Sequence, residues 1–555
     1  MALSSEARAD LVAAVGEEYV ATDPSILMSH AWNNNILGSD IGAEQTVHTS
    51  AFSDRDAQME TASRRCSASS RPATATACAC FSTGWMTPPS SPNSVYIDLA
   101  RMNRIIKFDV ENQMAVIEPG VTAGVLQAEA LKHGLTSHVV GAGPTHSPLA
   151  SAAAFHGMGI SGATTGINGR NLLSTEWVTP DGRIVRLGSA GQTDRWFSSD
   201  GPGPGWRGMI RGVIGTTGSL GVFTRIGYKL YPWAEGPLRS TGSLPQVGME
   251  LRSTSALYQL RWDRWEDAAQ AAHDMLRAAI VFSFVRMPVE AMGGLLTASS
   301  TEYGMRSLAG TLPEAARLEN RIQWTVLTLA DSNAQAEYQA QVMHDIIQRT
   351  HGSALALTES ERGVMARNLA TSCYVQRAIR PNLIVTMFGI MDSFSLLPRV
   401  IERAQSLEES DRAKGLFSKP GPESSWVWPT EGRYMWLENT PLFNIRNPKG
   451  MAAAVRYMLR ASFSMVKKPL GTNGFLAGPL YDLFGPYYHN INRYLRRIKN
   501  TLDPNGLGET GYYVTAKMNP VTERVVPKLM NLLFSRLGAP ILKVVTDLKA
   551  ASRKN

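Results

Sequence analysis

Valine, isoleucine and leucine are all missing between Val47 and Val95, although the rest of the chain is patterned like a folded protein. A gap of this length is unusual wherever a chain contributes to a hydrophobic core. Small and polar residues fill it, as in SRRCSASSRPATATACACFSTGW, residues 63 to 85. Either this region is a disordered insert, or something has replaced a normal helix or strand.

Cysteine is also scarce, with four residues of 555, and Cys66, Cys78 and Cys80 fall in that same gap. A Cys-x-Cys without histidines at zinc spacing does not predict a metal site, and neither a disulfide framework nor an iron–sulfur cluster is supported. No apolar run reaches the roughly 18 residues that span a bilayer, and the N-terminus is acidic where a signal peptide is basic. We therefore expect a cytoplasmic protein without metal.

The length and the charge balance limit the class of protein. At 555 residues the chain is too long for one core, so at least two domains are expected. The net charge of +8 is uneven, because residues 521–555 carry seven Lys/Arg and two Asp/Glu. This basic and apolar tail favours docking to an acidic membrane surface, on the cytoplasmic side, or to a partner subunit; a helix lying on its own domain is the alternative. Nucleic acid is not expected, because basic residues and aromatics do not interleave elsewhere.

A regular pattern begins at Val95. Short strands are predicted at 95–98 and 114–118, followed by a helix from about 123 to 133 that Thr122 can cap. The run GAGPTHSPLASAAAFHGMGISGATTGINGRN then offers bare backbone N–H groups to phosphate oxygens. A hairpin follows in LLSTEWVTPDGRIVRLGS, and glycines precede a strand from Val222 to Leu230.

The composition changes beyond Trp233, where ENRIQWTVLTLADSNAQAEYQAQVMHDIIQRTHGS predicts a strand and a long amphipathic helix. The chain is therefore divided into an N-terminal helical segment (1–45), a first domain (46–235), a second α+β domain (236–520) and the basic tail (521–555).

Four segments carry a resemblance to a known family: MAVIEPGVTAGVLQAEALKHGL, NLLSTEWVTPDGRIVRLGS, GVIGTTGSLGVFTRIGYKL and IKNTLDPNGL. In this order they resemble the flavin-binding fold of the p-cresol methylhydroxylase and vanillyl-alcohol oxidase superfamily, which includes D-lactate and glycolate dehydrogenases. The resemblance implies an α+β protein, in which a two-subdomain FAD-binding domain is followed by an α+β cap domain.

The resemblance also bears on the segment that lacks valine, isoleucine and leucine. In the family, a helix, a strand and the loop that grips the flavin pyrophosphate precede Val95, and here FSTGW stands at that loop. Back-translation of residues 68–80 in a shifted frame permits the apolar and small residues that such a helix and strand need. We hypothesise that about residues 50–80 are translated out of frame, with a disordered insert as the alternative.

The implied cofactor is FAD, held without a covalent bond because the first loop lacks the family's attachment histidine. By resemblance, its binding residues are Ser82, Thr83, Gly84, Trp85, Pro144, Thr145, His146, Ser147, His156, Gly157, Gly162, Gly218, Gly221, Val222 and Lys517.

The implied reaction is hydride transfer to the flavin from a hydroxy acid or alcohol, with a 4-substituted phenol or aromatic alcohol as the alternative donor. The metal-binding histidine segments of the hydroxy-acid dehydrogenases are missing. The candidate catalytic residues are Tyr488, His489, Arg493 and Tyr513. Three of them also have a purely structural interpretation: Tyr488 as part of an aromatic core, His489 as a structural histidine, and Arg493 as part of a solvated helix face.

The sequence does not identify the electron acceptor or any partner subunit. The chain has no haem or cluster motif, so the electron acceptor is a separate redox protein, a quinone or oxygen. A non-catalytic flavin-fold subunit of a redox complex is the alternative from another class. An assembly of identical subunits is compatible with the sequence.

Overall fold

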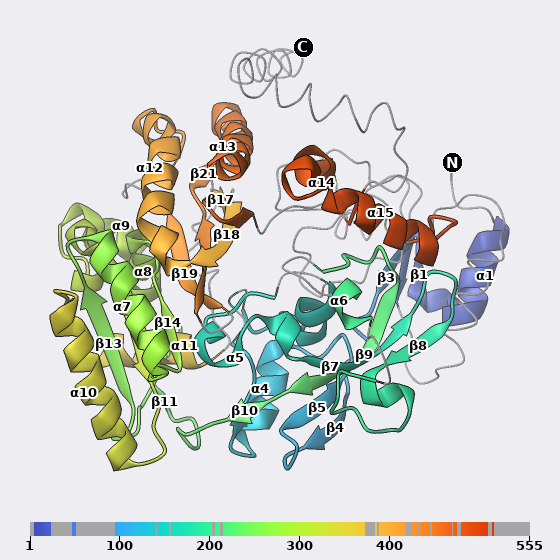
Figure 1. Cartoon of the computed structure of the whole chain (residues 1–555), viewed down its shortest axis with the longest axis horizontal. Coiled ribbons are helices and arrows are strands. Elements are labelled where there is room, and N and C mark those ends of the chain that lie inside the picture. The colour runs from blue at the N-terminus through green and yellow to red at the C-terminus, as the bar shows by residue number, and fades with distance from the viewer. Residues whose placement is uncertain are drawn as a thin grey trace.

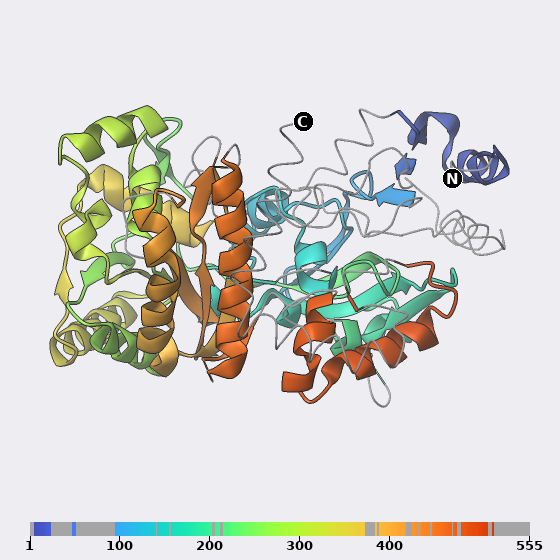
Figure 2. The same cartoon turned by 90° about the horizontal axis from the view of Figure 1, so that it is seen from above.

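The computed structural model describes most of the chain between residues 5 and 514. The described ranges are 5–23, 47–50, 95–139, 141, 143–154, 157–201, 206–210, 215–371, 383–385, 388–417, 424–430, 433–444, 447–468, 470–473, 479–508 and 513–514. The hypothesis of a frame change at residues 50–80 and the predicted basic tail therefore fall, apart from Ser50, outside the described residues. Two bodies lie side by side, the first domain and the second domain (Figures 1 and 2).

A five-stranded antiparallel sheet forms the centre of the first domain. Its order is β4 (Ile105–Asp109), β5 (Met114–Ile117), β9 (Val222–Lys229), β7 (Leu172–Val178) and β8 (Ile184–Leu187). The helix α4 (Ala123–Leu131) begins at Thr122, whose hydroxyl accepts a hydrogen bond from the Val125 amide at 3.3 Å. The strands, hairpin and capped helix that the sequence predicted here are confirmed.

A smaller sheet belongs to the same body. The strand β2 (Val47–Ser50) pairs in parallel with β3 (Val95–Asp98) and antiparallel with β1 (Val20–Ala21), which follows the helix α1 (Ser5–Val15). Leu99 and Met102 pack against Val222, the first residue of β9. The small sheet and the five-stranded sheet are thereby joined at the start of β9.

The second domain is built on two four-stranded sheets that meet at one bridge. One sheet has the order β14 (Ser283–Val285), β15 (Gln323–Thr328), β13 (Ala256–Arg261) and β16 (Ser353–Ala354). The other has β19 (Ser425–Thr430), β20 (Tyr434–Asn439), β18 (Phe388–Ser393) and β22 (Thr472–Asn473). A backbone bridge between Arg286 and Val427 connects them.

Helices cover both faces of this joined sheet (Figure 1). On one face the apolar core includes residues of α7 (Trp265–Ala278), α10 (Asn333–Arg349), α12 (Leu397–Ala413) and α13 (Pro448–Lys467). On the other face it includes residues of α8 (Val289–Leu296) and α11 (Glu359–Ala370), together with Met158, Ile160 and Ile167 of the first domain. The second face is therefore the one that meets the first domain.

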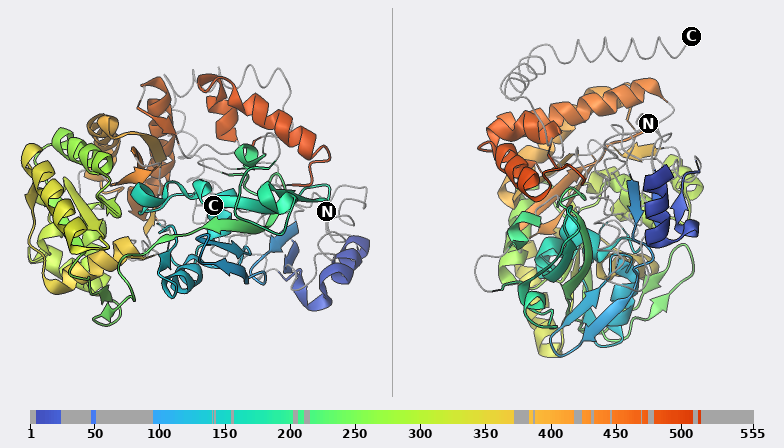
Figure 3. Two further views of the ribbon diagram at one scale, coloured as in Figure 1. Left: turned by 60° about the horizontal axis from the view of Figure 1, so that its bottom comes forward. Right: turned by 90° about the vertical axis from the view of Figure 1, so that its right-hand side faces the viewer.

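The end of the described chain returns to the first domain. The helices α14 (Pro479–Phe484) and α15 (Ile491–Leu502) run along its outer side (Figures 1 and 3). Leu495, Ile498 and Leu502 pack against the core beneath the five-stranded sheet, which also contains Tyr513. The predicted second domain, 236–520, therefore divides, because its part from 479 onward packs with the first domain.

Two of the resembling segments meet in space through α15. The Lys499 ammonium donates to the Ser219 carbonyl and to the Asp503 carboxylate, each at 2.5 Å. Asp503 also accepts from the amides of Leu507 and Gly508, at 2.8 and 2.9 Å. The IKNTLDPNGL segment thus closes onto GTTGSLGV. No described helix is both long and apolar enough to span a membrane.

Candidate functional site

Two glycine-rich segments predicted as cofactor loops lie together in the first domain. The Thr217 amide donates to the Ala154 carbonyl at 2.7 Å, so residues 215–222 run beside the buried small-residue turn 150–154. Gly221 has a φ of 114°, and a Cβ there would lie 2.1 Å from the Val178 carbonyl oxygen. Only glycine is compatible with both restrictions. The segment that contains Gly218, Gly221 and Val222 therefore meets the turn 150–154 through Gly215 and Thr217, and its Gly221 packs against Val178.

The loop from Pro144 to Ser147 is tied to the start of α4. The Pro144 and His146 carbonyls accept from the Gly124 and Ala123 amides at 2.8 and 2.7 Å. The Ser147 hydroxyl donates to the Pro119 carbonyl at 2.5 Å and accepts from Ala150. These contacts satisfy the first amides of α4 internally, and they hold the loop in a fixed position.

The His146 imidazole is a buried polar group of this loop. Its side chain is only 5% exposed, and its Nε2 atom has no hydrogen-bond partner in the described part of the chain. Burial lowers the pKa of His146 to about 4, so the ring is neutral at physiological pH. An unpartnered buried nitrogen costs free energy unless a bound group completes it. Thr145, its neighbour, is exposed.

A second buried histidine, which the sequence reasoning missed, lies next to this loop. His138 Nδ1 is 2.7 Å from the Thr165 hydroxyl, and burial lowers the His138 pKa to about 4, with a smaller effect from nearby His146. The only available signal was a histidine placed just before the small-residue run. The small loops, the obligatory glycine and the imidazole together fit the phosphate-rich and polar parts of a dinucleotide such as FAD.

The same loop system reaches the second domain. The Thr164 hydroxyl donates to the Phe282 carbonyl at 2.8 Å. A Cβ on Gly162 would lie 1.9 Å from the Pro429 carbonyl oxygen in β19. Gly162 therefore allows the backbone of the small-residue loop to contact the backbone of β19, which is the edge strand of a second-domain sheet.

Aromatic side chains line the sheet face at this seam. Trp428 of β19 stands directly opposite Trp436 of β20, and Trp426 stands opposite Glu438. Trp428 and Trp436 pack in one cluster with Met158 and other residues of the first domain. We name the set Trp426, Trp428, Trp436 and Glu438 the tryptophan face.

Glu438 is the titratable group of the tryptophan face. Its carboxylate accepts a hydrogen bond from Trp436 Nε1 at 2.8 Å. Burial raises the pKa of Glu438 to about 7, an effect that the hydrogen bond only partly opposes. Gly389, its neighbour on β18, has no side chain to crowd it. A carboxyl group with a pKa near neutrality can take and return a proton.

Two donors of the same region lack partners. Trp428 Nε1 and the Thr430 hydroxyl are buried, and neither has a hydrogen-bond partner among the described residues. Buried polar groups are normally paired, so unpaired ones mark places where a ligand completes the structure. Nothing in the sequence distinguishes these two residues from other tryptophans and threonines.

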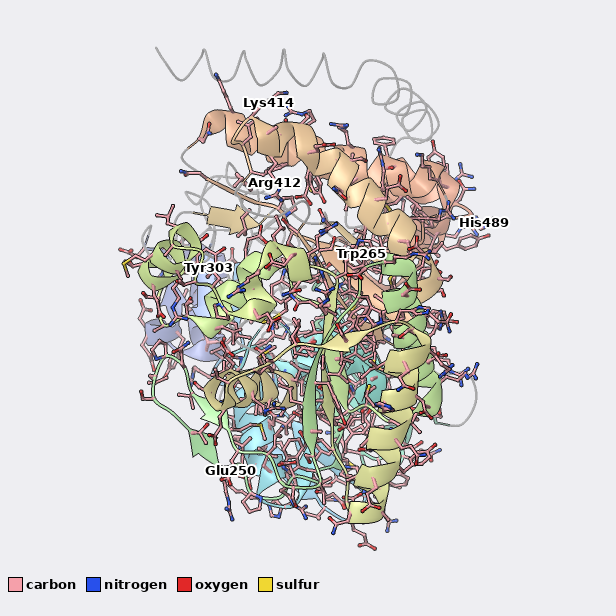
Figure 4. All side chains as sticks on the ribbon, turned by 90° about the vertical axis from the view of Figure 1, so that its left-hand side faces the viewer. Glu250, Trp265, Tyr303, Arg412, Lys414 and His489 are labelled. Atoms are coloured by element: carbon pink, nitrogen blue, oxygen red, sulfur yellow. The ribbon has the colours of Figure 1, made fainter. Side chains whose placement is uncertain are left out.

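The predicted catalytic residues lie elsewhere. His489, whose φ is 52°, is exposed in the turn before α15, and Tyr488 is half-buried in the same turn. Arg493 is exposed in the first turn of α15. Figure 4 shows His489 at the outer edge of the molecule. Tyr513 is buried in the first-domain core, where burial raises its pKa and its hydroxyl has no partner within the described residues. The structure does not bring these four residues together with the tryptophan face.

Six predicted cofactor residues cannot be placed. Ser82, Thr83, Gly84, Trp85, His156 and Lys517 lie outside the described residues. Their assignment to FAD stays a prediction.

Comparison with known proteins identifies the first domain. Residues 56–188 match the FAD-binding domain family. The chain therefore carries an FAD-binding domain, and FAD is its cofactor. The matched range begins inside the segment for which we hypothesise a frame change.

Two relatives by sequence are named as an FAD-linked oxidoreductase and a dehydrogenase. The chain is 26% identical over 213 residues to an uncharacterized FAD-linked oxidoreductase of Mycobacterium tuberculosis, covering 36% of this chain and 44% of the relative. It is 27% identical over 139 residues to a D-lactate dehydrogenase of Anaerostipes hadrus, covering 25% and 27%. The chain thus matches less than half the length of these relatives.

Solved structures of similar fold superpose on nearly the whole chain. The 4-ethylphenol oxidase of Gulosibacter chungangensis superposes with a TM-score of 0.72 at 15% identity, covering 92% of this chain and 98% of that one. p-Cresol methylhydroxylase gives 0.69 at 15% identity, covering 92% and 96%. The chain has the fold of the p-cresol methylhydroxylase type of flavoprotein, as its sequence segments predicted.

Proposed function

We propose that the protein is an FAD-dependent dehydrogenase or oxidase that takes a hydride from an aromatic alcohol or from a benzylic C–H. Bound FAD supplies the hydride acceptor. The observation that carries the proposal is the tryptophan face, which places a carboxyl group of near-neutral pKa at the seam with the FAD-binding domain. The solved structures of similar fold, both named for phenolic substrates, support it.

Glu438 is the proposed base. The Trp436 indole fixes the orientation of one carboxylate oxygen, Oε1, at 2.8 Å. The second oxygen then takes the proton from the hydroxyl of the donor. Because burial has already raised its pKa to about 7, the group is poised to accept a proton near neutral pH.

The tryptophans supply the proposed substrate selectivity. Indole rings stack on an aromatic ring and exclude water from the reacting carbon. A hydroxy acid would place its own carboxylate near Glu438, where two like charges in an apolar site repel. The match to a D-lactate dehydrogenase keeps oxidation of a hydroxy acid as the second candidate.

The first experiment is an absorption spectrum of the purified protein before and after acid precipitation. Flavin absorbance that stays in the supernatant establishes FAD held without a covalent bond, and flavin in the pellet overturns that expectation. A colourless protein would support the alternative that the chain is a non-catalytic subunit. The gene segment that encodes residues 50–81 would then be sequenced again.

Ligand titration of the yellow protein then separates the two donors. An aromatic alcohol or phenol is expected to bleach the flavin or to give a charge-transfer band at lower concentration than any hydroxy acid. Bleaching by small hydroxy acids alone would overturn the aromatic assignment and leave the FAD-dependent class intact.

A further inference from the structure

Three rows of paired side chains cross the strands that carry the tryptophan face. The ladder between β19 and β20 sets them out as the pairs Trp426–Glu438, Trp428–Trp436 and Thr430–Tyr434. Residues directly opposite in a ladder point to the same side of a sheet, and so do alternate residues of one strand. Thr430 therefore lies on the same side as Glu438, two rows away from it.

This side of the sheet is the one that faces the FAD-binding domain. Val427 and Leu437, which alternate with the rows, belong to the core that includes α12 and α13. Trp428 belongs to the core that the second domain shares with the first. At the last row the two domains are in contact, because a Cβ on Gly162 would lie 3.2 Å from the Cα of Thr430.

Two of the three rows carry a buried polar group without a partner. Trp428 and Thr430 are 6% and 1% exposed, and neither the indole Nε1 nor the threonine hydroxyl has a hydrogen-bond partner among the described residues. An indole N–H can only donate, and a hydroxyl can donate as well. Both groups are therefore completed by a ligand that brings an acceptor oxygen to this side of the sheet.

The spacing of the rows indicates which part of a substrate would carry that oxygen. Trp428 is one row from Glu438, which is about 7 Å along the strands, because alternate residues are separated by twice the rise per residue. A benzene ring with substituents at its two ends has a comparable length. An aromatic alcohol whose hydroxyl meets Glu438 therefore places its para substituent at the row of Trp428, with Thr430 beyond it.

The charge of the rows favours a neutral acceptor. The paired side chains of the three rows include one acid, Glu438, and no basic residue. A carboxylate on the ring would therefore be buried without a cation, on the same side as the base. A carbonyl oxygen has two lone pairs and no charge, so it can accept from both Trp428 and Thr430.

We propose that Trp428 and Thr430 form a hydrogen-bonding subsite for a carbonyl oxygen on the substrate ring, so that the preferred donor is an aromatic alcohol with a para ketone, ester or amide group. The inference rests on the proposed function, because Glu438 must hold the reacting hydroxyl for the far end of the ring to reach the subsite. Trp428 and Thr430 determine specificity in this arrangement, and they exchange no proton.

The test compares two alcohols of similar shape on the full-length, FAD-loaded protein: 4-acetylbenzyl alcohol, which carries the carbonyl, and 4-isopropylbenzyl alcohol, which lacks it. Anaerobic reduction of the flavin gives an apparent Kd and a limiting rate for each alcohol. A neutral hydrogen bond contributes about fivefold to affinity, so two of them predict that the parent binds the acetyl compound about 25-fold more tightly.

Two substitutions remove the donors one at a time. Trp428→Phe deletes the indole N–H, and Thr430→Val deletes the hydroxyl while it keeps the shape. Each is expected to reduce the preference for the acetyl compound to about fivefold, and the double variant is expected to abolish it. The change is expected in the ratio of the Kd values rather than in the ratio of the limiting rates, and the electronic effect of the substituent cancels because it is the same in every variant.

Thr254 supplies the matched control. Its hydroxyl is also buried without a partner in the described part of the chain, but it lies outside β19 and β20. Thr254→Val is expected to keep the preference of the parent. The ratio of flavin to protein absorbance checks that each variant is folded. The FAD affinity of the same variants, measured by flavin fluorescence, distinguishes the substrate from the cofactor as the source of the acceptor.

Three outcomes would overturn the proposal. Equal Kd values for the two alcohols in the parent, or an unchanged preference in the double variant, would exclude the subsite. A loss of FAD affinity in Trp428→Phe and Thr430→Val, with both alcohols weakened equally, would assign the two donors to the cofactor. Reduction of the flavin by small hydroxy acids and by neither aromatic alcohol would overturn the proposed function, and this inference with it.

Discussion

Replacing Glu438 with glutamine tests the site through stability as well as activity. Glutamine keeps the shape and can still accept the indole hydrogen bond from Trp436, but it does not ionise. In the folded protein the pKa of Glu438 is about 7, against an ordinary value of 4.5. Ionisation therefore opposes folding in the parent protein and is absent from the variant.

The pH dependence follows from the sign of this difference. Because the folded-state pKa is raised, the stability that the protonated carboxyl provides is complete below pH 4.5 and is lost as the pH rises through about 7. The difference between these pKa values corresponds to about 3 kcal/mol. Glu438→Gln is therefore expected to unfold like the parent at pH 4.5 and to be more stable by up to about 3 kcal/mol at pH 8.5.

The assay is urea unfolding at a series of pH values, followed by tryptophan fluorescence, with kcat measured on the same samples. The variant is expected to lose activity by about 10²- to 10⁴-fold, while the parent gains activity as the pH passes through about 7. Parallel stability profiles for the two proteins between pH 5 and 8.5 would refute the reasoning, since Glu438 would then titrate normally. A variant with full activity would remove Glu438 from the role of base.

Three further substitutions probe the framework around the site. Lys499→Met leaves Asp503 buried without its cation and is expected to cost about 3–5 kcal/mol in urea unfolding, whereas Arg183→Met, in an exposed pair, is expected to cost much less; equal losses would contradict this. Gly162→Ala is expected to lower the melting temperature because of the contact with Pro429, whereas Gly208→Ala, with open space around it, is not. His146→Leu is expected to weaken FAD binding about fivefold to tenfold by flavin fluorescence, with His146→Gln closer to the parent; unchanged affinity would exclude His146 from the cofactor site.

The first domain was largely predictable because its elements follow local rules. The short apolar run of β5, the cap on α4 by Thr122 and the glycines before β9 are all visible in the sequence. The contact of Lys499 with Ser219 joins two of the segments that carry the family resemblance, but the sequence analysis did not predict it. What could not be foreseen is that α15 belongs to this domain, because a basic helix gives no sign of which distant sheet it covers.

The candidate site was much less predictable. Glu438 is one acid in an aromatic strand, and its unusual pKa arises only when β20 pairs with β19 and β18 and the resulting face is buried. Tyr488, His489 and Arg493 had suitable chemistry for catalysis, but a left-handed turn at His489 and Asn490 leaves His489 and Arg493 facing solvent. Residue type indicates what a side chain can do, whereas only the packing decides whether it meets a substrate.

The attachment of α15 to the first domain also has a consequence for synthesis on the ribosome. Lys499 bonds to a carbonyl 280 positions earlier, and the apolar side of its helix completes the core under the five-stranded sheet. Domains usually fold in the order in which they emerge, N-terminal first. Here the first domain must wait, with part of its core uncovered, until the whole second domain has been translated. This nascent intermediate should be a preferred target of chaperones, and the second domain is the part of the protein that can mature first.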